Sequence, residues 1–269
     1  MSAPSLDSLP ETARLDSAAI AALALRHAAR WRLGLVDARH SEIFASSGDA
    51  AGAGLALALA NDTLSAARTA SQGVPGIEVD DRRSVLWVQD SGVIRRSGRP
   101  YRPGLPPWLR ERVIHVAAKD AADALFALEE GLRCRDLACV IGELAGNPRS
   151  LDFTASRRLS LAAERHGVPL WLVRVDAARD LSSARLRWEA RQAASSPPEW
   201  NRQAPGDPAW RAELFRARTH APGQWLLREN GGALEQASLP PAGIGQSIAR
   251  CASGTPFMPT SPDGERVYG

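Results

Sequence analysis

The sequence contains little cysteine and almost no lysine. Its 269 residues include three cysteines, Cys134, Cys139 and Cys251, and a single lysine, Lys119, among 33 basic residues. Three cysteines cannot all pair within the chain and their spacing matches no zinc motif, so they indicate reduced thiols and no disulfide framework. The five histidines are scattered, which gives no basis for a metal cluster or a Ser/His/Asp set. We therefore expect neither a metal site nor catalytic residues.

Long apolar runs are also missing. No segment approaches the about 18 apolar residues that a transmembrane helix needs, so no membrane association is expected. The apolar stretch Ile20–Leu25 lacks the flanks of a signal peptide. With 44% hydrophobic and 23% charged residues, the composition is that of a soluble globular protein, for which we expect a cytoplasmic location. A net charge of +3 is too small to argue for nucleic-acid binding by itself.

One segment resembles a phosphate loop that lacks the residues needed to bind phosphate and Mg²⁺. A strand-like run at 42–44 leads into Ala45-Ser46-Ser47-Gly48-Asp49-Ala50, and an Ala/Leu-rich helix follows. A working loop reads G-x-x-x-x-G-K-[ST], in which backbone N–H groups and the Lys hold phosphates and the hydroxyl holds Mg²⁺. Here Ala45 replaces the first glycine, the spacing to Gly48 is two residues short, Asp49 replaces the Lys and Ala50 replaces the hydroxyl. The segment predicts a strand–turn–helix without a nucleotide, so no cofactor is expected.

Asp49 also lies where it can cap the following helix. The first N–H groups of a helix are unpaired and the helix dipole is positive there, so a carboxylate at that position takes donors that a phosphate needs. The alternative interpretation is that residues 45–50 form an ordinary Ser/Gly/Asp turn that caps a helix and have no history as a phosphate loop.

Strand and helix patterns alternate along most of the chain. Apolar runs predict strands at 42–45, 85–88, 113–116, 137–141 and 169–173. Helical patterns run from Asp49 to about Thr69, from an N-cap at Asp120, and from an N-cap at Thr154 to His166 with Gly167 at C′. Such alternation predicts an α/β fold with a mostly parallel sheet flanked by helices.

The two ends of the chain differ from this core. Residues 1–34 are expected to form an N-terminal segment with an amphipathic helix at about 17–31. Residues 35–236 are expected to form the core, in which the period-two runs 186–190, 210–216 and 224–227 predict an antiparallel extension from about residue 184. Residues 237–269 are rich in Pro, Gly and Ser without periodicity, which is typical of a disordered, flexible tail.

Several short runs in this order resemble the RecA core and, within that superfamily, the ImuA family. They cover about residues 40–230 and are His40–Ala45, Gly48–Ala50, Val85–Gln89, Gly98–Tyr101 with Gly104-Leu105, Asp120–Leu125, Glu129–Arg133, Val140–Leu144, Thr154–Leu159 and Trp210–Arg218. The resemblance implies a RecA-like core with a degenerate Walker A loop.

The resemblance also implies a function. ImuA proteins are non-catalytic, RecA-like accessory proteins of the SOS response to DNA damage, where they support error-prone translesion synthesis and mutagenesis. Members of this family work with ImuB, a catalytically inactive Y-family polymerase homologue, and with an error-prone C-family polymerase, and they associate with RecA on damaged DNA. We accordingly expect a cytoplasmic, nucleoid-associated protein that acts in DNA repair through protein–protein interaction, and we leave open whether it forms a homo-oligomer.

Two alternative functions remain. A SulA-type cell division inhibitor is also RecA-related and also lacks a phosphate loop, although the C-terminal extension argues against it. A residual ATPase would use the Gly48 turn and Glu143, which follows the strand where a Walker B strand should end in Asp.

The basic residues suggest one contact surface. Arg95, Arg96, Arg99 and Arg102, with Tyr101 among them, lie in a Gly/Pro-containing loop that has no acidic residue from 91 to 110. Such a loop suits phosphate contact with base stacking, docking on an acidic partner, or a solvated surface, and the sequence leaves all three open. The loop at about 176–183, where RecA-type cores hold DNA, carries Asp176 and Asp180 instead, so this inherited DNA route is expected to be weakened.

Overall fold

The computed structural model describes residues 29–35, 39–71, 83–195 and 197–237. The chain divides into two units, Met1–Ser238 and Leu239–Gly269, and all described residues belong to the first. The tail expected at 237–269 therefore lies outside the described residues except for Ala237, as does most of the helix expected at 17–31. Among the helices in the described ranges, none is both long and apolar enough to cross a membrane.

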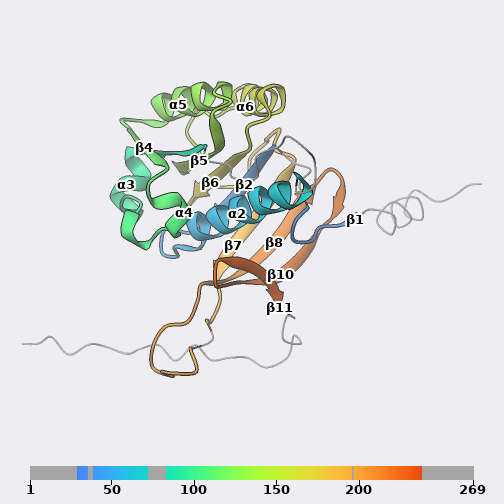
Figure 1. The fold of residues 1–269 in the computed structure, drawn as a ribbon. Coiled ribbons are helices and arrows are strands. Elements are labelled where there is room, and N and C mark those ends of the chain that lie inside the picture. Colours follow the sequence, from blue (N-terminus) through green and yellow to red (C-terminus); the bar gives the residue numbers. More distant parts are fainter. Residues whose placement is uncertain (1–28, 36–38, 72–82, 196, 238–269) are drawn as a thin grey trace, which may run out of the picture. The chain divides into compact units, whose positions relative to one another are not determined.

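A nine-stranded sheet forms the centre of the fold, with the strand order β11-β10-β8-β7-β2-β6-β5-β3-β4 (Figure 1). The six strands from β7 to β4 in this order are parallel, and β8, β10 and β11 continue the sheet as antiparallel strands. The strands are β2 His40–Ala45, β3 Ser84–Asp90, β4 Val113–Ala118, β5 Leu137–Ala145, β6 Leu170–Val175, β7 Leu186–Gln192, β8 Ala209–Ala217, β10 Gly223–Asn230 and β11 Ala233–Ala237. This is the predicted α/β class, a mostly parallel sheet with an antiparallel extension.

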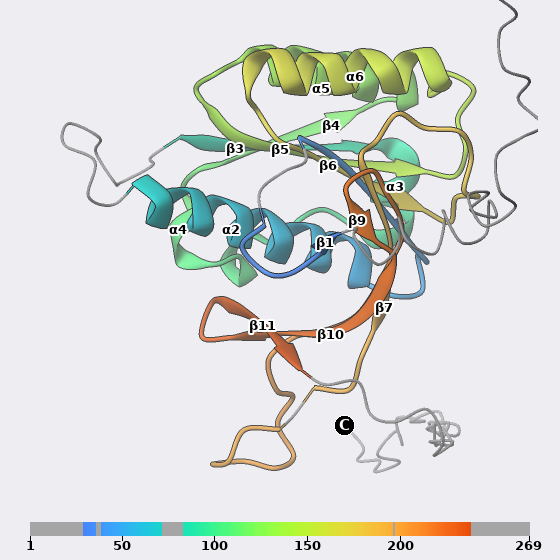
Figure 2. The same ribbon diagram turned by 90° about the vertical axis from the view of Figure 1, so that its right-hand side faces the viewer.

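Helices cover both faces of the sheet. The long α2, Ala51–Ser71, lies on one face, and α5, Ala121–Arg133, and α6, Phe153–His166, lie side by side on the other (Figure 2). The short α3, Ser91–Ser97, a 3₁₀ turn at Arg102–Gly104 and α4, Pro107–Arg110, connect β3 to β4. The sheet thus has a separate apolar core on each face.

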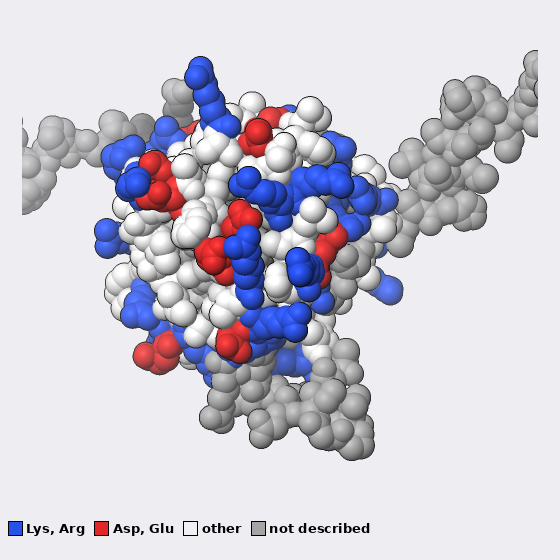
Figure 3. Space-filling view, turned by 90° about the horizontal axis from the view of Figure 1, so that it is seen from above, with Lys and Arg blue, Asp and Glu red and all other residues white. Residues whose placement is uncertain are grey.

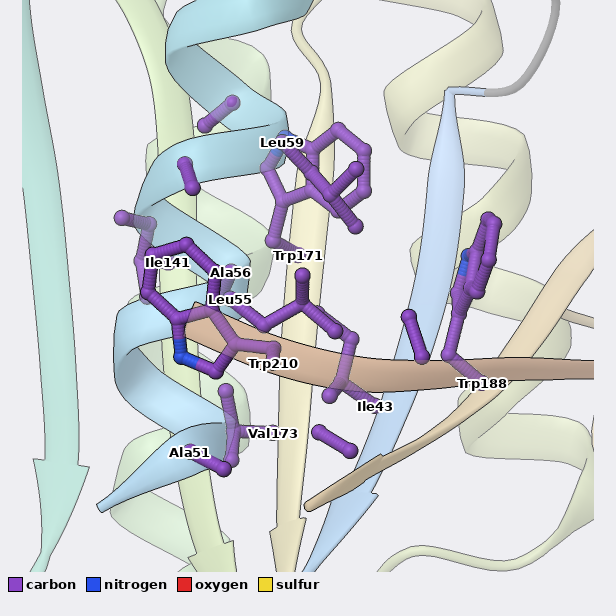
Figure 4. Close-up of a cluster of buried hydrophobic side chains, with 14 of the residues drawn as sticks. Ile43, Ala51, Leu55, Ala56, Leu59, Ile141, Trp171, Val173, Trp188 and Trp210 are labelled. Carbon is purple, nitrogen blue, oxygen red and sulfur yellow. The ribbon is translucent and has the colours of Figure 1, made fainter. Parts of the chain in front are cut away.

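The core beneath α2 joins the parallel and antiparallel strands. Leu55 and Leu59 of α2 point onto Ile141, Trp171 and Val173 of the parallel strands, and the same cluster includes Trp188 of β7 and Trp210 of β8 (Figure 4). Trp210 is 4% exposed and Trp225 of β10 is 1% exposed, so both rings pack within this core. Burial of these large rings contributes much of the hydrophobic stabilisation on this side.

The start of the described chain differs from the prediction. Ala29–Arg30 forms a short parallel strand, β1, paired with β9, His220–Ala221, so the helix expected at about 17–31 does not include residues 29–31. Trp31 is buried against two rings of the extension, with centroids 4.8 Å from Trp188 and 5.2 Å from Trp225. Aromatic packing of this kind overrides the local helical pattern.

The direction of β7 also corrects the prediction. The period-two run 186–190 was assigned to the antiparallel extension, but β7 pairs in parallel with β2, and antiparallel pairing starts only with β8. Alternation of apolar and polar residues indicates that one face of a strand is more exposed than the other. It does not indicate the direction of the strand, so the parallel strand β7 can show it too.

Strand lengths and helix caps show smaller differences. β5 continues to Ala145, beyond the predicted end at Ile141. Asp120 caps α5 as predicted, by accepting a hydrogen bond from the Asp123 N–H at 2.9 Å. In α6 the N-cap is Asp152, which accepts from the Ala155 N–H at 2.7 Å, and not Thr154, whereas Gly167 ends the helix in the left-handed region as expected.

Candidate functional site

The altered phosphate loop lies at the edge of the sheet where parallel strands end. Residues 46–50 connect β2 to α2, and β2 lies between β6 and β7. In open α/β sheets, ligands bind at the carboxyl ends of the strands, close to such a point in the strand order. Gly52 allows α2 to approach the sheet here, because a Cβ at this position would lie 2.8 Å from both Ala45 Cβ and Val173 Cγ1.

Asp49 occupies the start of α2. Its Oδ1 accepts a hydrogen bond from the Ala51 N–H at 2.8 Å, and its Oδ2 accepts from the Gln192 N–H, at the end of β7, at 2.6 Å. The carboxylate therefore takes a donor at the helix N-terminus, as the sequence predicted, and also joins α2 to β7.

Asp176, which directly follows β6, is the second carboxylate in this loop. Its Oδ1 accepts from the Ser47 N–H at 2.9 Å. The pKa of Asp176 is lowered by this backbone hydrogen bond first and by the side chain of Ser47 next, with a smaller contribution from the positive charge of Arg96. Its φ of 52° lies in the left-handed region, which Asp tolerates better than most residues.

Two further backbone donors are used within the loop itself. The Gly48 N–H donates to Ser46 Oγ at 3.2 Å, and the Asp49 N–H donates to the Ser46 carbonyl at 3.1 Å. A bound phosphate needs several of these N–H groups at once and would face the negative charges of Asp49 and Asp176. Oxygen atoms of the chain itself thus occupy the N–H groups of Ser47, Gly48, Asp49 and Ala51.

Glu143 lies within β5 and not at the edge where the sequence placed it. It is 3% exposed, and its Oε1 accepts from Trp87 Nε1 at 2.5 Å and from Gln89 Nε2 at 3.1 Å. Burial raises the pKa of Glu143, which favours the neutral acid. Among the described residues, no group of three or more His, Cys, Asp and Glu side chains could hold a metal ion.

The predicted basic loop is partly helical. Arg95 and Arg96 belong to α3, which begins where Asp90 accepts a hydrogen bond from the Val93 N–H at 2.7 Å. Arg96 forms an ion pair with Asp176 at 3.9 Å, so the basic segment reaches the loop after β6. The Asp at the end of β3 was the signal for this helix, because Asp is a favoured N-cap and the following residues contain no proline until Pro100.

The rest of the basic segment divides between surface and structure. Arg102 Nη2 donates to the Val113 carbonyl at 3.0 Å and so helps to hold this segment against β4. Arg99 is exposed, and Tyr101 is 74% exposed. The structure thus brings Arg99 and Tyr101 together at the surface, while Arg95 and Arg96 lie on the preceding helix.

Two cavities flank the altered loop, and sequence reasoning found neither. One, of about 310 Å³, is lined by Glu143, Trp87, the start of α2 and the segment 97–101. The other, of about 580 Å³, has a more polar lining that includes Asp176, Arg179 and Glu189. Ala45, Ser46 and Asp49 line both cavities. A cavity forms where separate elements meet, so no local sequence pattern predicts it.

A buried ion network supports the loop that follows β6. Glu42 of β2 is fully buried, its Oε2 accepts from Arg187 Nε at 2.8 Å, and its Oε1 accepts from Ser182 Oγ at 2.7 Å. Arg174, 1% exposed, lies 3.8 Å from the same carboxylate and 3.2 Å from Asp180. Asp180 is thus used to hold the loop 176–185 onto the sheet, a role that its position in the sequence did not reveal.

Charges on the face of α5 and α6 are interspersed (Figure 3). Arg133 pairs with Glu129 at 3.0 Å and with Glu130 at 2.5 Å, and Arg158 lies 3.5 Å from Glu129. Both glutamates are thus paired with arginines at the surface. His115 forms a hydrogen bond with Gln89 Oε1 at 3.0 Å and is partly buried.

The fold is that of an α/β protein with a mostly parallel sheet flanked by helices, and the loop between β2 and α2 lacks the side chains of a phosphate loop. No family model matches the chain. Two curated relatives, both named Protein ImuA and from two strains of Caulobacter vibrioides, are 34% identical to it over 158 residues. The matched part makes up 54% of this chain and 60% of each relative's length. This similarity supports membership of the ImuA family and confirms the resemblance found in the sequence.

Proposed function

We propose that this protein is a non-catalytic, RecA-like accessory protein of SOS-induced, error-prone translesion DNA synthesis. It acts by binding a polymerase-like partner, an inactive Y-family homologue of the ImuB type, within an assembly that includes an error-prone C-family polymerase, RecA and DNA. The 34% identity to Protein ImuA supports this assignment. Because the match spans about 60% of that relative, the partners belong to the proposal.

The observation that carries the proposal is the occupied loop. Asp49 and Asp176 accept hydrogen bonds from the Ala51 and Ser47 N–H groups, at the positions where a nucleotide phosphate needs donors. A protein that keeps a RecA-like core while filling its phosphate loop with carboxylates is suited to act through its surface.

Isothermal titration calorimetry of the full chain with ATP and Mg²⁺, with and without single-stranded DNA, tests the loss of nucleotide binding. We expect no heat at millimolar ATP. Binding in the micromolar range would contradict the non-catalytic assignment and would require a nucleotide switch.

A residual ATPase, which would use the Gly48 turn and Glu143, is the second candidate. Glu143 Oε1 already accepts hydrogen bonds from Trp87 and Gln89, and burial favours the neutral acid, which is a poor base for activating water. Hydrolysis by the purified chain that Glu143→Gln abolishes would reverse this preference.

Co-purification tests the partner. The full chain, expressed with the inactive polymerase homologue and separately with a tubulin-like division protein, is expected to retain only the polymerase homologue. Retention of the division protein alone would favour the SulA-type inhibitor instead.

A further inference from the structure

The smaller of the two cavities has the composition of a ligand site. Its volume of about 310 Å³ lies at the lower end of the range for small-molecule pockets, and its wall is mostly apolar. The wall includes Ala45, Ala53, Leu57, Trp87, Leu105 and Val173. A few polar groups, among them Ser46, Asp49 and Arg99, lie around it.

A carboxyl group in this cavity has an oxygen without a partner. Both hydrogen bonds to Glu143, from Trp87 Nε1 and Gln89 Nε2, reach Oε1, and no other described residue bonds Oε2. Glu143 is 3% exposed and lines the cavity. Oε2 is not fully enclosed by the protein, so an occupant of the cavity can pair with it. Burial also favours the neutral acid, which can donate as well as accept a hydrogen bond.

The rim of the cavity carries an exposed aromatic ring and positive charge. Tyr101, 74% exposed, and Arg99 line the cavity from the segment after α3, and Arg95 is exposed on α3 itself. Gln89 Nε2 also donates to the Gly98 carbonyl at 3.1 Å, so the same glutamine contacts Glu143 and holds the rim segment in place.

From this arrangement we infer that the cavity binds one unstacked base of single-stranded DNA. The base edge pairs with Glu143 Oε2, the ring of Tyr101 stacks at the rim, and Arg99 lies near the adjoining phosphate. This inference rests on the proposed function, because it identifies how the accessory protein contacts DNA directly.

A base fits these groups better than a protein side chain does. An aliphatic side chain would leave Glu143 Oε2 unpaired, whereas the amino group and ring nitrogen of a base match the donor and acceptor of a neutral carboxyl. Exposed arginines beside an exposed aromatic ring suit a phosphate backbone with stacked bases.

Fluorescence anisotropy of a labelled single-stranded oligonucleotide with the full chain tests the rim. Tyr101→Ala is expected to weaken binding about tenfold, the effect of losing one stacked base. Arg99→Ala is expected to weaken binding and to reduce the salt slope by about 1. Trp200→Ala and Arg165→Ala are matched controls, because both residues are exposed and lie on other elements, and neither is expected to change binding.

Cavity occupancy needs a separate measurement. Unlabelled competitors of equal length, one complete and one abasic, are compared. The complete DNA is expected to compete at least about tenfold better than the abasic strand. Ala53→Phe, which fills the cavity, and Glu143→Leu are expected to abolish the preference for bases. Glu143→Gln, which keeps a donor and an acceptor, is expected to retain it.

Several results would overturn the inference. They are equal competition by the abasic strand, no DNA binding by the wild-type chain, or a full base preference in folded Ala53→Phe. If the wild-type chain does not bind DNA, a side chain of a partner protein becomes the better candidate for the occupant of the cavity. The proposed function fails by a different result, the loss of co-purification with the polymerase homologue, so the two failures can be told apart.

Discussion

At the scale of single residues, two carboxylates from distant parts of the chain hold the loop between β2 and α2. Asp49 comes from the loop itself, and Asp176 follows β6, 129 residues after its partner Ser47. Each accepts a hydrogen bond from a backbone N–H, which is the interaction that a phosphate makes at a helix N-terminus. A negative side chain at this position stabilises the helix and takes a donor that a phosphate would use.

Asp49→Ala is expected to lower the free energy of unfolding by about 1 kcal/mol, because the Ala51 and Gln192 N–H groups lose their acceptor. Urea denaturation followed by circular dichroism measures this change. Asp49→Asn keeps an acceptor oxygen and should lose less. Equal losses in the two variants would mean that the charge of the carboxylate matters and the hydrogen bond does not.

His40 is expected to make the free energy of unfolding depend on pH. Burial is the main cause that lowers its pKa from 6.5 to about 4, and its Nδ1 bonds Ser160 Oγ at 2.7 Å. Between these values the unfolded chain binds a proton that the folded chain does not, so stability is full above pH 6.5 and falls towards pH 4. The loss attributable to His40 amounts to about 3 kcal/mol.

Urea denaturation across this pH range, in wild type and in His40→Gln, isolates the contribution of this histidine. The variant should lose the part of the pH dependence that His40 carries, and His166→Gln on α6 should keep it. An unchanged pH dependence in His40→Gln would contradict the assignment.

At the scale of elements, the ends of α6 separate what a pattern predicts from what it misses. Gly167 was found from the sequence because only glycine readily adopts the left-handed end of a helix. The N-cap was misplaced by two residues, because Asp152 and Thr154 both favour that position and the sequence does not show which side chain faces the first turn.

Paired alanine variants distinguish these two caps. Asp152→Ala is expected to reduce the free energy of unfolding by about 1 kcal/mol, since the Ala155 N–H loses its acceptor. Thr154→Ala replaces an exposed residue inside the helix and is expected to change stability by less than about 0.5 kcal/mol. Chemical denaturation of both proteins decides between the caps, and a larger loss in Thr154→Ala would favour the original assignment.

Other elements show the same division between local and distant interactions. The parallel strands were predicted because a buried apolar run is a local signal. The direction of β7 and the strand Ala29–Arg30 depend on partners far along the chain, β2 and β9. The candidate site shows the same division. The helix-capping role of Asp49 can be predicted from the residues next to it in the sequence. Asp176, Trp87 and Gln89 meet their partners only in the folded sheet, so their contacts cannot be predicted in this way.

At the scale of the whole described unit, the antiparallel strands are part of the same core as the parallel ones. Leu55 of α2 lies in one apolar cluster with Val173 of β6, Trp210 of β8 and Trp225 of β10. Gly54 of α2 packs against the Trp210 ring, where an added Cβ would lie 3.1 Å from Nε1. Removal of β8 to β11 would therefore expose one side of this core and the outer edge of β7.

We accordingly expect the described unit to unfold in one cooperative transition. Tryptophan fluorescence, to which rings on both halves of the sheet contribute, and far-ultraviolet circular dichroism should give coincident urea curves. A chain truncated after Gln192 should not fold, since it loses the rings that cover α2 and the hydrogen bonds along β7. Two separate transitions, or a folded truncated chain, would show instead that the antiparallel strands form an addition to a core that is stable without them. In that case, substitutions in β8 to β11 would leave the packing of α2 and the altered loop unchanged. A single transition means instead that substitutions in β8 to β11 also affect the packing of α2.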